Sequence, residues 1–310
     1  MKSGKTVLIT GASTGLGLAI ARALTKTNYR VYLTARQSSL PRFEMHEVRE
    51  SEHVRIRPLD VTSLEQRNAI VAEAERDSGG IDILINNAGI TYRAVVEHVA
   101  EDEWIAQMDV NFRSPMELIR LVLPGMRQKG AGRIITVSSV GGMMAMPTMA
   151  AYSASKFALE GAHESLWYEV RPWGIKVTLL QPGFIDSDGF QKVRYTPRSG
   201  RSEQDLADPY HEHYVNMAPF IARLMKSSRA TPDSVARVVL KTMRRRNPPL
   251  RVPATFDAFA FSSLRRILPR STYHWLLYKM LPKVGTWGPL QRRASLPSQT
   301  EQDPSEGGRD

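Results

Sequence analysis

The alternation of short apolar runs with longer amphipathic stretches constrains the fold of this chain more than any other feature. The apolar runs are rich in Val, Ile and Leu and lie at 6–10, 30–34, 54–59, 81–85, 133–137 and 176–180. The stretches between them carry helical spacing. Strands that alternate with helices form right-handed crossovers, which make the sheet parallel and cover both of its faces. The sequence therefore predicts an α/β fold with a single doubly wound, mostly parallel sheet.

The pattern changes after residue 185. A polar stretch rich in Pro and Arg indicates a lid over about 186–228. The run at 250–252 lies between prolines, which suits only an edge strand. Two apolar stripes with helical spacing predict a helical C-terminal extension over about 254–283. We expect one domain over 1–289 and a disordered tail over 290–310, where Ser, Gln, Glu, Pro and Gly dominate.

A glycine-rich loop with the spacing G-x-x-x-G-x-G follows the first apolar run and leads into helical sequence. Glycines permit a tight turn and let backbone N–H groups approach a pyrophosphate at the positive end of a helix. This arrangement predicts a Rossmann-type dinucleotide site, and a glycine-rich turn without a ligand is the alternative. The residues expected to contact the cofactor are Gly11, Ser13, Thr14, Gly15, Leu16 and Gly17.

The residue that follows the second strand predicts which dinucleotide is bound. A domain that binds NAD usually places Asp or Glu there, to hold the ribose 2′-hydroxyl. This chain has Ala35 and then Arg36, so a guanidinium is available to pair with a 2′-phosphate. We therefore expect NADP(H) in preference to NAD(H), unless Arg36 is only a solvated cation. Asp60 and Val61, which end the third strand, are expected to meet the adenine edge.

Tyr152 and Lys156 are the candidate catalytic pair, near the start of a predicted helix. Four residues make about one helical turn, so both side chains share a face. A phenol has a pKa of about 10, and an ammonium about 4 Å away favours its ionised form by roughly 4 kcal/mol, or about three pKa units. The sequence thus predicts a phenol that serves as a general acid or base. Ser139 ends another strand and is expected to hold a substrate oxygen beside it.

These motifs together resemble the short-chain dehydrogenase/reductase family. In chain order they are the glycine loop, Asn86-Asn87-Ala88-Gly89, Ser139 and Tyr152-x-x-x-Lys156, and the resemblance covers about residues 5–190. The segments around Ser139 and Tyr152 are similar to the hydroxysteroid and retinol dehydrogenase branch. The resemblance implies that Asn111 is a fourth catalytic residue, which fixes a water linked to Lys156. Further cofactor contacts are expected at Asn87, Ala88, Gly89, Pro182, Gly183 and Ile185.

The resemblance implies an oxidoreductase that interconverts a secondary alcohol and a ketone or aldehyde by hydride transfer. Tyr152 would exchange the proton, Ser139 would bind the substrate oxygen, and Lys156 would hold the nicotinamide ribose. Family members usually have a Thr after the Pro-Gly turn. The nearest substitute here is Ser187, which puts the affinity for the cofactor and the closed position of the lid in doubt.

A lipophilic substrate is expected, such as a steroid, a retinoid or a long-chain carbonyl compound. Four methionines lie between Ser139 and Tyr152, and flexible thioethers suit an adaptable apolar pocket. Filling of the hydrophobic core is an equally good use for them. They are Met143, Met144, Met146 and Met149.

The net charge of +11 lies entirely in the last two-fifths of the chain. Residues 1–189 hold 21 basic and 21 acidic side chains, whereas residues 190–310 hold 21 and 10. A solvated basic surface explains this, but anionic membranes or acidic ligands are alternatives. A peripheral membrane surface over 255–283 is therefore one competing hypothesis. A regulatory protein that binds NADPH without turnover is another, and nucleic-acid binding is not expected.

Composition excludes several other classes of protein. The chain has no cysteine, which excludes disulfides, cysteine-bound metals and a cysteine nucleophile. Its histidines form no complete set of metal ligands, so no metal site is expected. The apolar runs are shorter than the ~18 residues that a membrane-spanning helix needs, and the N-terminal run is too short for a signal peptide. We expect a cytoplasmic protein, and the family resemblance implies a homodimer or homotetramer.

Overall fold

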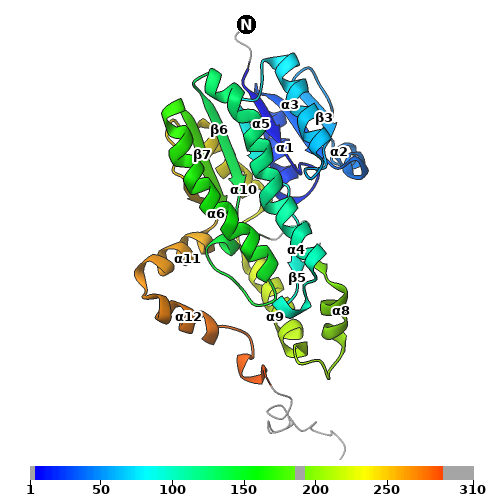
Figure 1. Ribbon diagram of the computed structural model, residues 1–310, viewed down its shortest axis with the longest axis vertical. Coiled ribbons are helices and arrows are strands. Elements are labelled where there is room, and N and C mark those ends of the chain that lie inside the picture. Colours follow the sequence, from blue (N-terminus) through cyan, green and yellow to red (C-terminus); the bar gives the residue numbers. More distant parts are fainter. Residues whose placement is uncertain (1–3, 186–192, 289–310) are drawn as a thin grey trace, which may run out of the picture.

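A seven-stranded parallel sheet forms the centre of the protein (Figure 1), as seen in a computed structural model that describes residues 4–185 and 193–288. The strand order is β3-β2-β1-β4-β6-β7-β9, and every neighbouring pair is parallel. The strands are β1 Thr6–Ile9, β2 Arg30–Ala35, β3 Val54–Pro58, β4 Ile83–Asn86, β6 Gly132–Val137, β7 Ile175–Gln181 and β9 Arg251–Pro253. The predicted doubly wound sheet is confirmed, and the run near 250 forms its edge strand as expected.

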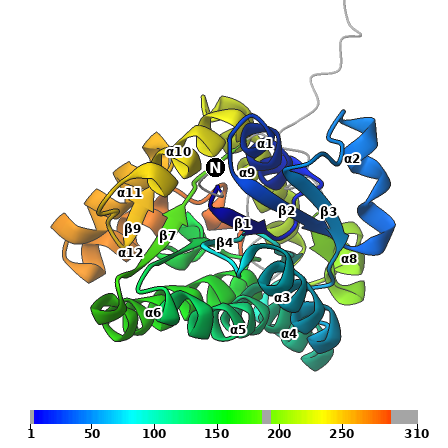
Figure 2. The same ribbon diagram turned by 90° about the horizontal axis from the view of Figure 1, so that it is seen from above.

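Helices cover both faces of this sheet (Figure 2). Helices α1 and α10 lie on one face, and α3, α5 and α6 lie on the other. Their bounds are α1 Gly15–Thr25, α3 Leu64–Ser78, α5 Ser114–Gln128, α6 Ala150–Val170 and α10 Pro232–Arg244. The other α-helices in the described part of the domain are α2 Pro41–Met45, α4 Glu101–Met108, α8 Pro197–Gln204 and α9 His211–Ser227.

The alternation of side chains along each strand divides the hydrophobic core into two parts, one on each face of the sheet. Successive residues of a strand face opposite sides of the sheet. Val7 and Ile9 pack against α1 and α10, whereas Leu8 between them packs against the helices of the other face. All three side chains are fully buried. Strands buried on both faces explain why the sequence shows continuous apolar runs rather than a polar alternation.

The strand order reverses between β1 and β4, and this reversal determines where a ligand can bind. The strand that follows β1 in sequence lies on one side of it, and β4 lies on the other. The connections after these strands therefore diverge and leave a crevice at their carboxyl ends. The glycine loop and Asn87 follow these two strands, so the predicted cofactor residues meet at this edge.

The segment after β7 departs from the regular alternation. Residues 186–192, which begin the expected lid and include Ser187, lie outside the described residues, as does the expected tail over 290–310. The rest of the segment expected to be a lid contains β8 Arg194–Tyr195, which pairs in parallel with β5 Tyr92–Arg93, and then α8 and α9. The sequence did not indicate this two-stranded sheet, because each of its strands has only two residues.

Two helices leave the edge strand and extend beyond the domain as an arm (Figure 1). They are α11 Phe256–Ile267 and α12 Arg270–Lys279, and a short helical turn at Val284–Thr286 follows. Within the two described ranges of the chain, no helix is both long and apolar enough to cross a membrane.

Candidate active site

The glycine loop has the backbone shape that its sequence predicted. Gly11 adopts a φ of +64°, in the region that side chains disfavour, and a Cβ there would lie 2.8 Å from the Cα of Ala88. A Cβ on Gly17 would lie 2.1 Å from the carbonyl oxygen of Gly11. The first turn of α1 contains no acidic residue, and its N-cap Thr14 makes no capping hydrogen bond. The positive end of this helix is therefore suited to hold a phosphate group.

Asn87 and Thr10 join the loops that follow β4 and β1. The Thr10 hydroxyl accepts hydrogen bonds from the backbone N–H groups of Asn87 and Ala88, each at 3.0 Å. The Asn87 side-chain amide donates to the carbonyls of Thr10 and Gly11, also at 3.0 Å. These four bonds hold the two walls of the crevice in a fixed relation.

The crevice is a cleft of about 760 Å³, and every residue predicted to bind the cofactor or to act in catalysis lines it. Arg36 is exposed and lines the cleft together with Asp60, at the end where the 2′-phosphate and the adenine are expected. Burial raises the pKa of Asp60, but hydrogen bonds from Thr62 and the charge of Arg36 outweigh it and leave this pKa below its usual value. Ser39 and Arg42 also line this end. Their contribution was missed, because they follow Arg36 on a short turn and helix that no sequence pattern marked.

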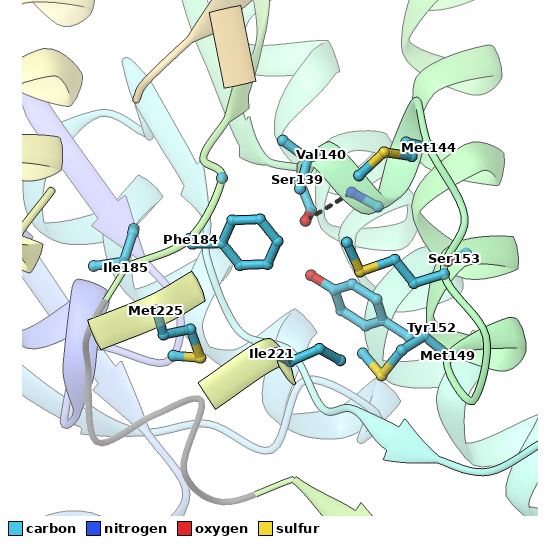
Figure 3. A pocket seen from close by; sticks show the side chains of 13 residues that line it. Ser139, Val140, Met144, Met149, Tyr152, Ser153, Phe184, Ile185, Ile221 and Met225 are labelled. Carbon is cyan, nitrogen blue, oxygen red and sulfur yellow. Dashed lines mark hydrogen bonds between the residues drawn. The ribbon is translucent and has the colours of Figure 1, made fainter. Parts of the chain in front are cut away.

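Ser139 and Tyr152 direct their hydroxyl groups toward a common space (Figure 3). The Ser139 Oγ accepts a hydrogen bond from the backbone N–H of Gly141 at 3.0 Å, which fixes the hydroxyl. The phenol ring packs on Gly141, where a Cβ would lie 2.8 Å from the Tyr152 Cε1. Small residues after β6 therefore make room for the tyrosine. Both hydroxyl groups can donate, so together they can hold a carbonyl oxygen between them.

Burial, rather than Lys156, controls the ionisation of Tyr152. Desolvation raises the pKa of Tyr152 above 10, although interaction with the Ser139 hydroxyl lowers it in part. The Lys156 Nζ lies 5.8 Å from the centre of the phenol ring and donates to the carbonyl of Val137 at 2.9 Å. Burial lowers the pKa of Lys156 itself to about 8. The expectation that Lys156 shifts the phenol pKa downward is therefore wrong for this structure, because desolvation opposes both charged forms.

Asn111 lies in a π-helical turn, Asp109–Arg113, between α4 and α5. Its side-chain oxygen accepts from the backbone N–H of Ile90 at 2.9 Å, and its amide donates to the carbonyl of Ile90 and to the Ser155 hydroxyl. The side chain is buried and binds these two residues rather than Lys156. Asn111 therefore ties the loop after β4 to α6, and its expected link to Lys156 through a water stays a prediction.

Comparison with known proteins agrees with this geometry. Residues 5–198 match the family described as short chain dehydrogenase. The chain belongs to this family. Its relatives are named as reductases and dehydrogenases, so the protein is an oxidoreductase of the short-chain dehydrogenase type.

Two curated relatives and two solved structures illustrate the similarity. A 3-ketodihydrosphingosine reductase of Bacteroides thetaiotaomicron is 35% identical over 245 residues, 79% of this chain and 86% of that protein. The human 17-beta-hydroxysteroid dehydrogenase type 1 is 31% identical over 251 residues, 79% of this chain and 76% of that protein. A short-chain dehydrogenase from Streptomyces avermitilis superposes with a TM-score of 0.75 at 28% identity, covering 90% of this chain and 99% of that one. An actinorhodin polyketide ketoreductase variant with NADPH has a TM-score of 0.64 at 27% identity, covering 82% of this chain and 97% of that one.

In this short-chain dehydrogenase a second, apolar cavity adjoins the cofactor cleft. It has a volume of about 50 Å³ and shares Ser139, Tyr152, Gly183 and Ile185 with the cleft. Phe184 faces Tyr152 across it (Figure 3). The other lining residues are Val140, Gly141, Met144, Met146, Met149, Ser153, Ile221 and Met225. Three of the four methionines noted in the sequence thus line the cavity, whereas Met143 is buried elsewhere.

Glu160 is a buried residue beside the site that sequence reasoning missed. It lies one helical turn after Lys156 and raises the pKa of that lysine. Its carboxylate accepts hydrogen bonds from the Ser138 hydroxyl at 2.7 Å, the Gln181 amide at 2.9 Å and the Arg251 Nε at 2.8 Å. The one available signal was the four-residue spacing of Tyr152, Lys156 and Glu160, which places all three on one face of α6.

Proposed function

We propose that this short-chain dehydrogenase uses NADP(H) to interconvert a lipophilic secondary alcohol and the corresponding ketone or aldehyde. The observation that carries the proposal is the meeting of the cofactor cleft and the apolar cavity at Ser139 and Tyr152. A substrate in the cavity would place its polar carbon within reach of a dinucleotide in the cleft, with both hydroxyls at its oxygen.

The residues of the cleft fit a bound dinucleotide. The glycine loop and the N-terminus of α1 would hold the pyrophosphate, and Lys156 would bind the ribose next to the nicotinamide. Pro182, Gly183 and Ile185 line the opposite wall. When bound, the nicotinamide supplies or accepts the hydride. Arg36, with Arg42 and Ser39 nearby, favours a 2′-phosphate and hence NADP(H).

Tyr152 and Ser139 perform the proton chemistry in this proposal. During reduction Tyr152 donates its proton to the carbonyl oxygen, and Ser139 hydrogen-bonds the same oxygen as negative charge develops there. The raised pKa keeps the phenol protonated at neutral pH, so the site is prepared to act as an acid.

The substrate class follows from the walls of the cavity. Methionine and isoleucine side chains with Phe184 offer few polar partners, which suits a hydrocarbon body beside the reacting carbonyl. A volume of about 50 Å³ is too small for such a body, so Phe184 or the methionines must move on binding. Two relatives are named for a sphingoid and a steroid substrate, which supports a lipid-like ketone here.

Replacement of Tyr152 by Phe tests the proposal. We expect Tyr152→Phe to lower kcat for ketone reduction by roughly 10²- to 10⁴-fold, since the proton donor is lost. NADPH binding, measured by fluorescence titration, should persist. Tyr29→Phe is the matched control, because Tyr29 lines neither the cleft nor the cavity, and it should leave kcat unchanged. Turnover retained in Tyr152→Phe would remove this residue from its proposed role.

We also propose a homodimer or homotetramer that pairs through α5 and α6, as the family resemblance implies. Tyr168 on α6 is 63% exposed, which leaves aromatic surface for a second copy. Sedimentation velocity distinguishes these assemblies from a monomer, and a monomer would contradict the proposal.

A further inference from the structure

The outer side of α11 carries an apolar stripe. Phe256, Phe259 and Ile267 are 86%, 59% and 78% exposed. Their spacing of three and eight residues places them on one side of the helix. Three large side chains in such a row are unusual on a solvent-facing helix, because apolar residues normally face the core.

Helix α12 continues this apolar surface with different residue types. Trp275 and Tyr278 are 60% and 54% exposed, and Met280 just after the helix is 55% exposed. Tyr273 on another side of the helix is buried, so α12 packs by one side and presents the other. Trp and Tyr combine an apolar ring with a polar group, which suits the boundary between water and lipid.

The arm also carries a strong positive charge. Residues 256–288 contain five Lys or Arg and one acidic residue, Asp257. The Asp257 carboxylate accepts a hydrogen bond from the backbone N–H of Phe184 at 2.8 Å, so it faces the domain. The five cations are all exposed, and they are Arg265, Arg266, Arg270, Lys279 and Lys283. The Arg265 guanidinium lies 5.4 Å from the centre of the Phe157 ring on α6 and so faces the domain, which leaves the other four cations for the outer side.

Both ends of the arm are attached to the domain next to the apolar cavity. At its beginning, Thr255 accepts a hydrogen bond from the backbone N–H of Gly183 at 2.9 Å. At its end, the Thr286 hydroxyl donates to Glu212 on α9 at 3.0 Å, and the Trp287 ring lies 4.4 Å from that of His213. The exposed side of the arm is therefore held in a fixed position by contacts on its inner side.

We propose that α11 and α12 form a docking surface for an anionic lipid bilayer. Aromatic and aliphatic side chains would enter the headgroup region, and the surrounding cations would bind lipid phosphates and carboxylates. Charge complementarity selects this occupant over a second copy of the chain, because two such arms would bring ten cations together. The excess charge of the whole protein lies in the same part of the sequence.

Vesicle binding by the full chain tests this proposal. We expect co-sedimentation with vesicles of phosphatidylcholine and phosphatidylserine, and little with phosphatidylcholine alone. Binding should weaken in about 1 M salt, which shortens the Debye length to about 3 Å. Vesicles with brominated acyl chains should quench the fluorescence of Trp275, and the variant Trp275→Phe should lose this part of the quenching.

A pair of charge-reversed variants separates the arm from the rest of the basic surface. The triple variant Arg266→Glu, Arg270→Glu and Lys279→Glu should weaken partition into anionic vesicles roughly 100-fold or more, at about 1 kcal/mol for each cation. The matched control replaces three exposed arginines at the end of α10, namely Arg244→Glu, Arg245→Glu and Arg246→Glu. This control changes the net charge by the same amount as the first triple variant, and it should retain most of the binding to anionic vesicles.

Three results would overturn the proposal. One is the absence of binding to anionic vesicles at low salt by a protein that still turns over NADPH. Another is an equal loss of binding in the two triple variants, which would indicate attraction by net charge alone. The third is an assembly that dissociates to monomers when Phe259 and Ile267 become Ser, since the stripe would then be an interface between protein chains.

Discussion

Among single residues, burial shifts the pKa of both members of the proposed catalytic pair. It raises the pKa of Tyr152 and lowers that of Lys156 to about 8, because neither a phenolate nor an ammonium is well solvated in an apolar site. Tyr152 therefore keeps its proton through the neutral range. Lys156 changes its charge within the range of an ordinary assay.

The pH dependence of turnover follows from these two shifts. We expect kcat/KM for ketone reduction to fall as the pH rises through about 8, since Lys156 loses its charge there while Tyr152 remains protonated. A pH profile with a soluble ketone and NADPH measures this. Lys156→Arg retains its cation and should move the fall to higher pH. A wild-type profile that stays flat well above pH 8 would contradict the assignment.

At the same scale, the proposed preference for NADP(H) rests on Arg36. A hydrogen bond to a charged group contributes about 1.5–3 kcal/mol, so Arg36→Glu should raise the KM for NADPH roughly 10- to 100-fold. The KM for NADH should fall or stay constant. Arg49→Glu is the matched control, because Arg49 is an exposed arginine that does not line the cleft. Equal effects of the two variants on NADPH would show that Arg36 does not meet the 2′-phosphate.

Among the elements, α6 joins the active site to the edge of the sheet. It carries Tyr152, Lys156 and Glu160 at intervals of one turn. Through Glu160 it reaches Ser138 after β6, Gln181 on β7 and Arg251 on β9. Helix α6 is therefore connected to these segments through a carboxylate that takes no part in the proposed chemistry.

Replacement of Glu160 by Gln tests this positioning role. We expect a loss of about 1–3 kcal/mol in the free energy of unfolding, measured with denaturant, because three donors lose a charged acceptor. Since Glu160 raises the pKa of Lys156, the fall in activity should also move to lower pH. Glu164→Gln is the control. The Glu164 side chain is 46% exposed and, of the three donors that Glu160 binds, pairs only with Arg251. Both the loss of stability and the shift of the pH profile should therefore be smaller. An unchanged pH profile in Glu160→Gln would contradict the coupling to Lys156.

At the scale of the whole molecule, the carboxyl edge of the sheet brings together every functional part. The cleft opens between the ends of β1 and β4, and the apolar cavity lies between the start of α6 and α9. The arm begins after β9, and its first residues accept hydrogen bonds from the turn after β7, which lines both spaces. The backbone turn at Gly183 and Phe184 thus contacts the start of the arm, which carries the proposed lipid surface, and also lines the proposed substrate cavity.

Much of the fold and the site could be predicted from the chain alone. Apolar runs such as Thr6–Ile9 mark strands because a strand buried on both faces must be apolar along its length. The glycine loop, Asn87, Ser139 and Tyr152 all follow strand ends or begin helices, so a parallel sheet necessarily gathers them at one edge. Local sequence was sufficient wherever a residue's position follows from its own strand or helix.

Only the tertiary structure determined how these residues are solvated and which distant segments meet them. The pKa of Tyr152 rises because the surrounding side chains desolvate the phenol, which the spacing to Lys156 does not reveal. Arg251 contacts Glu160 across 91 residues of sequence, and the arm turns its aromatic side chains outward while Tyr273 packs inward. Periodicity describes neighbours along the chain, whereas burial and long-range contacts depend on how the completed elements pack.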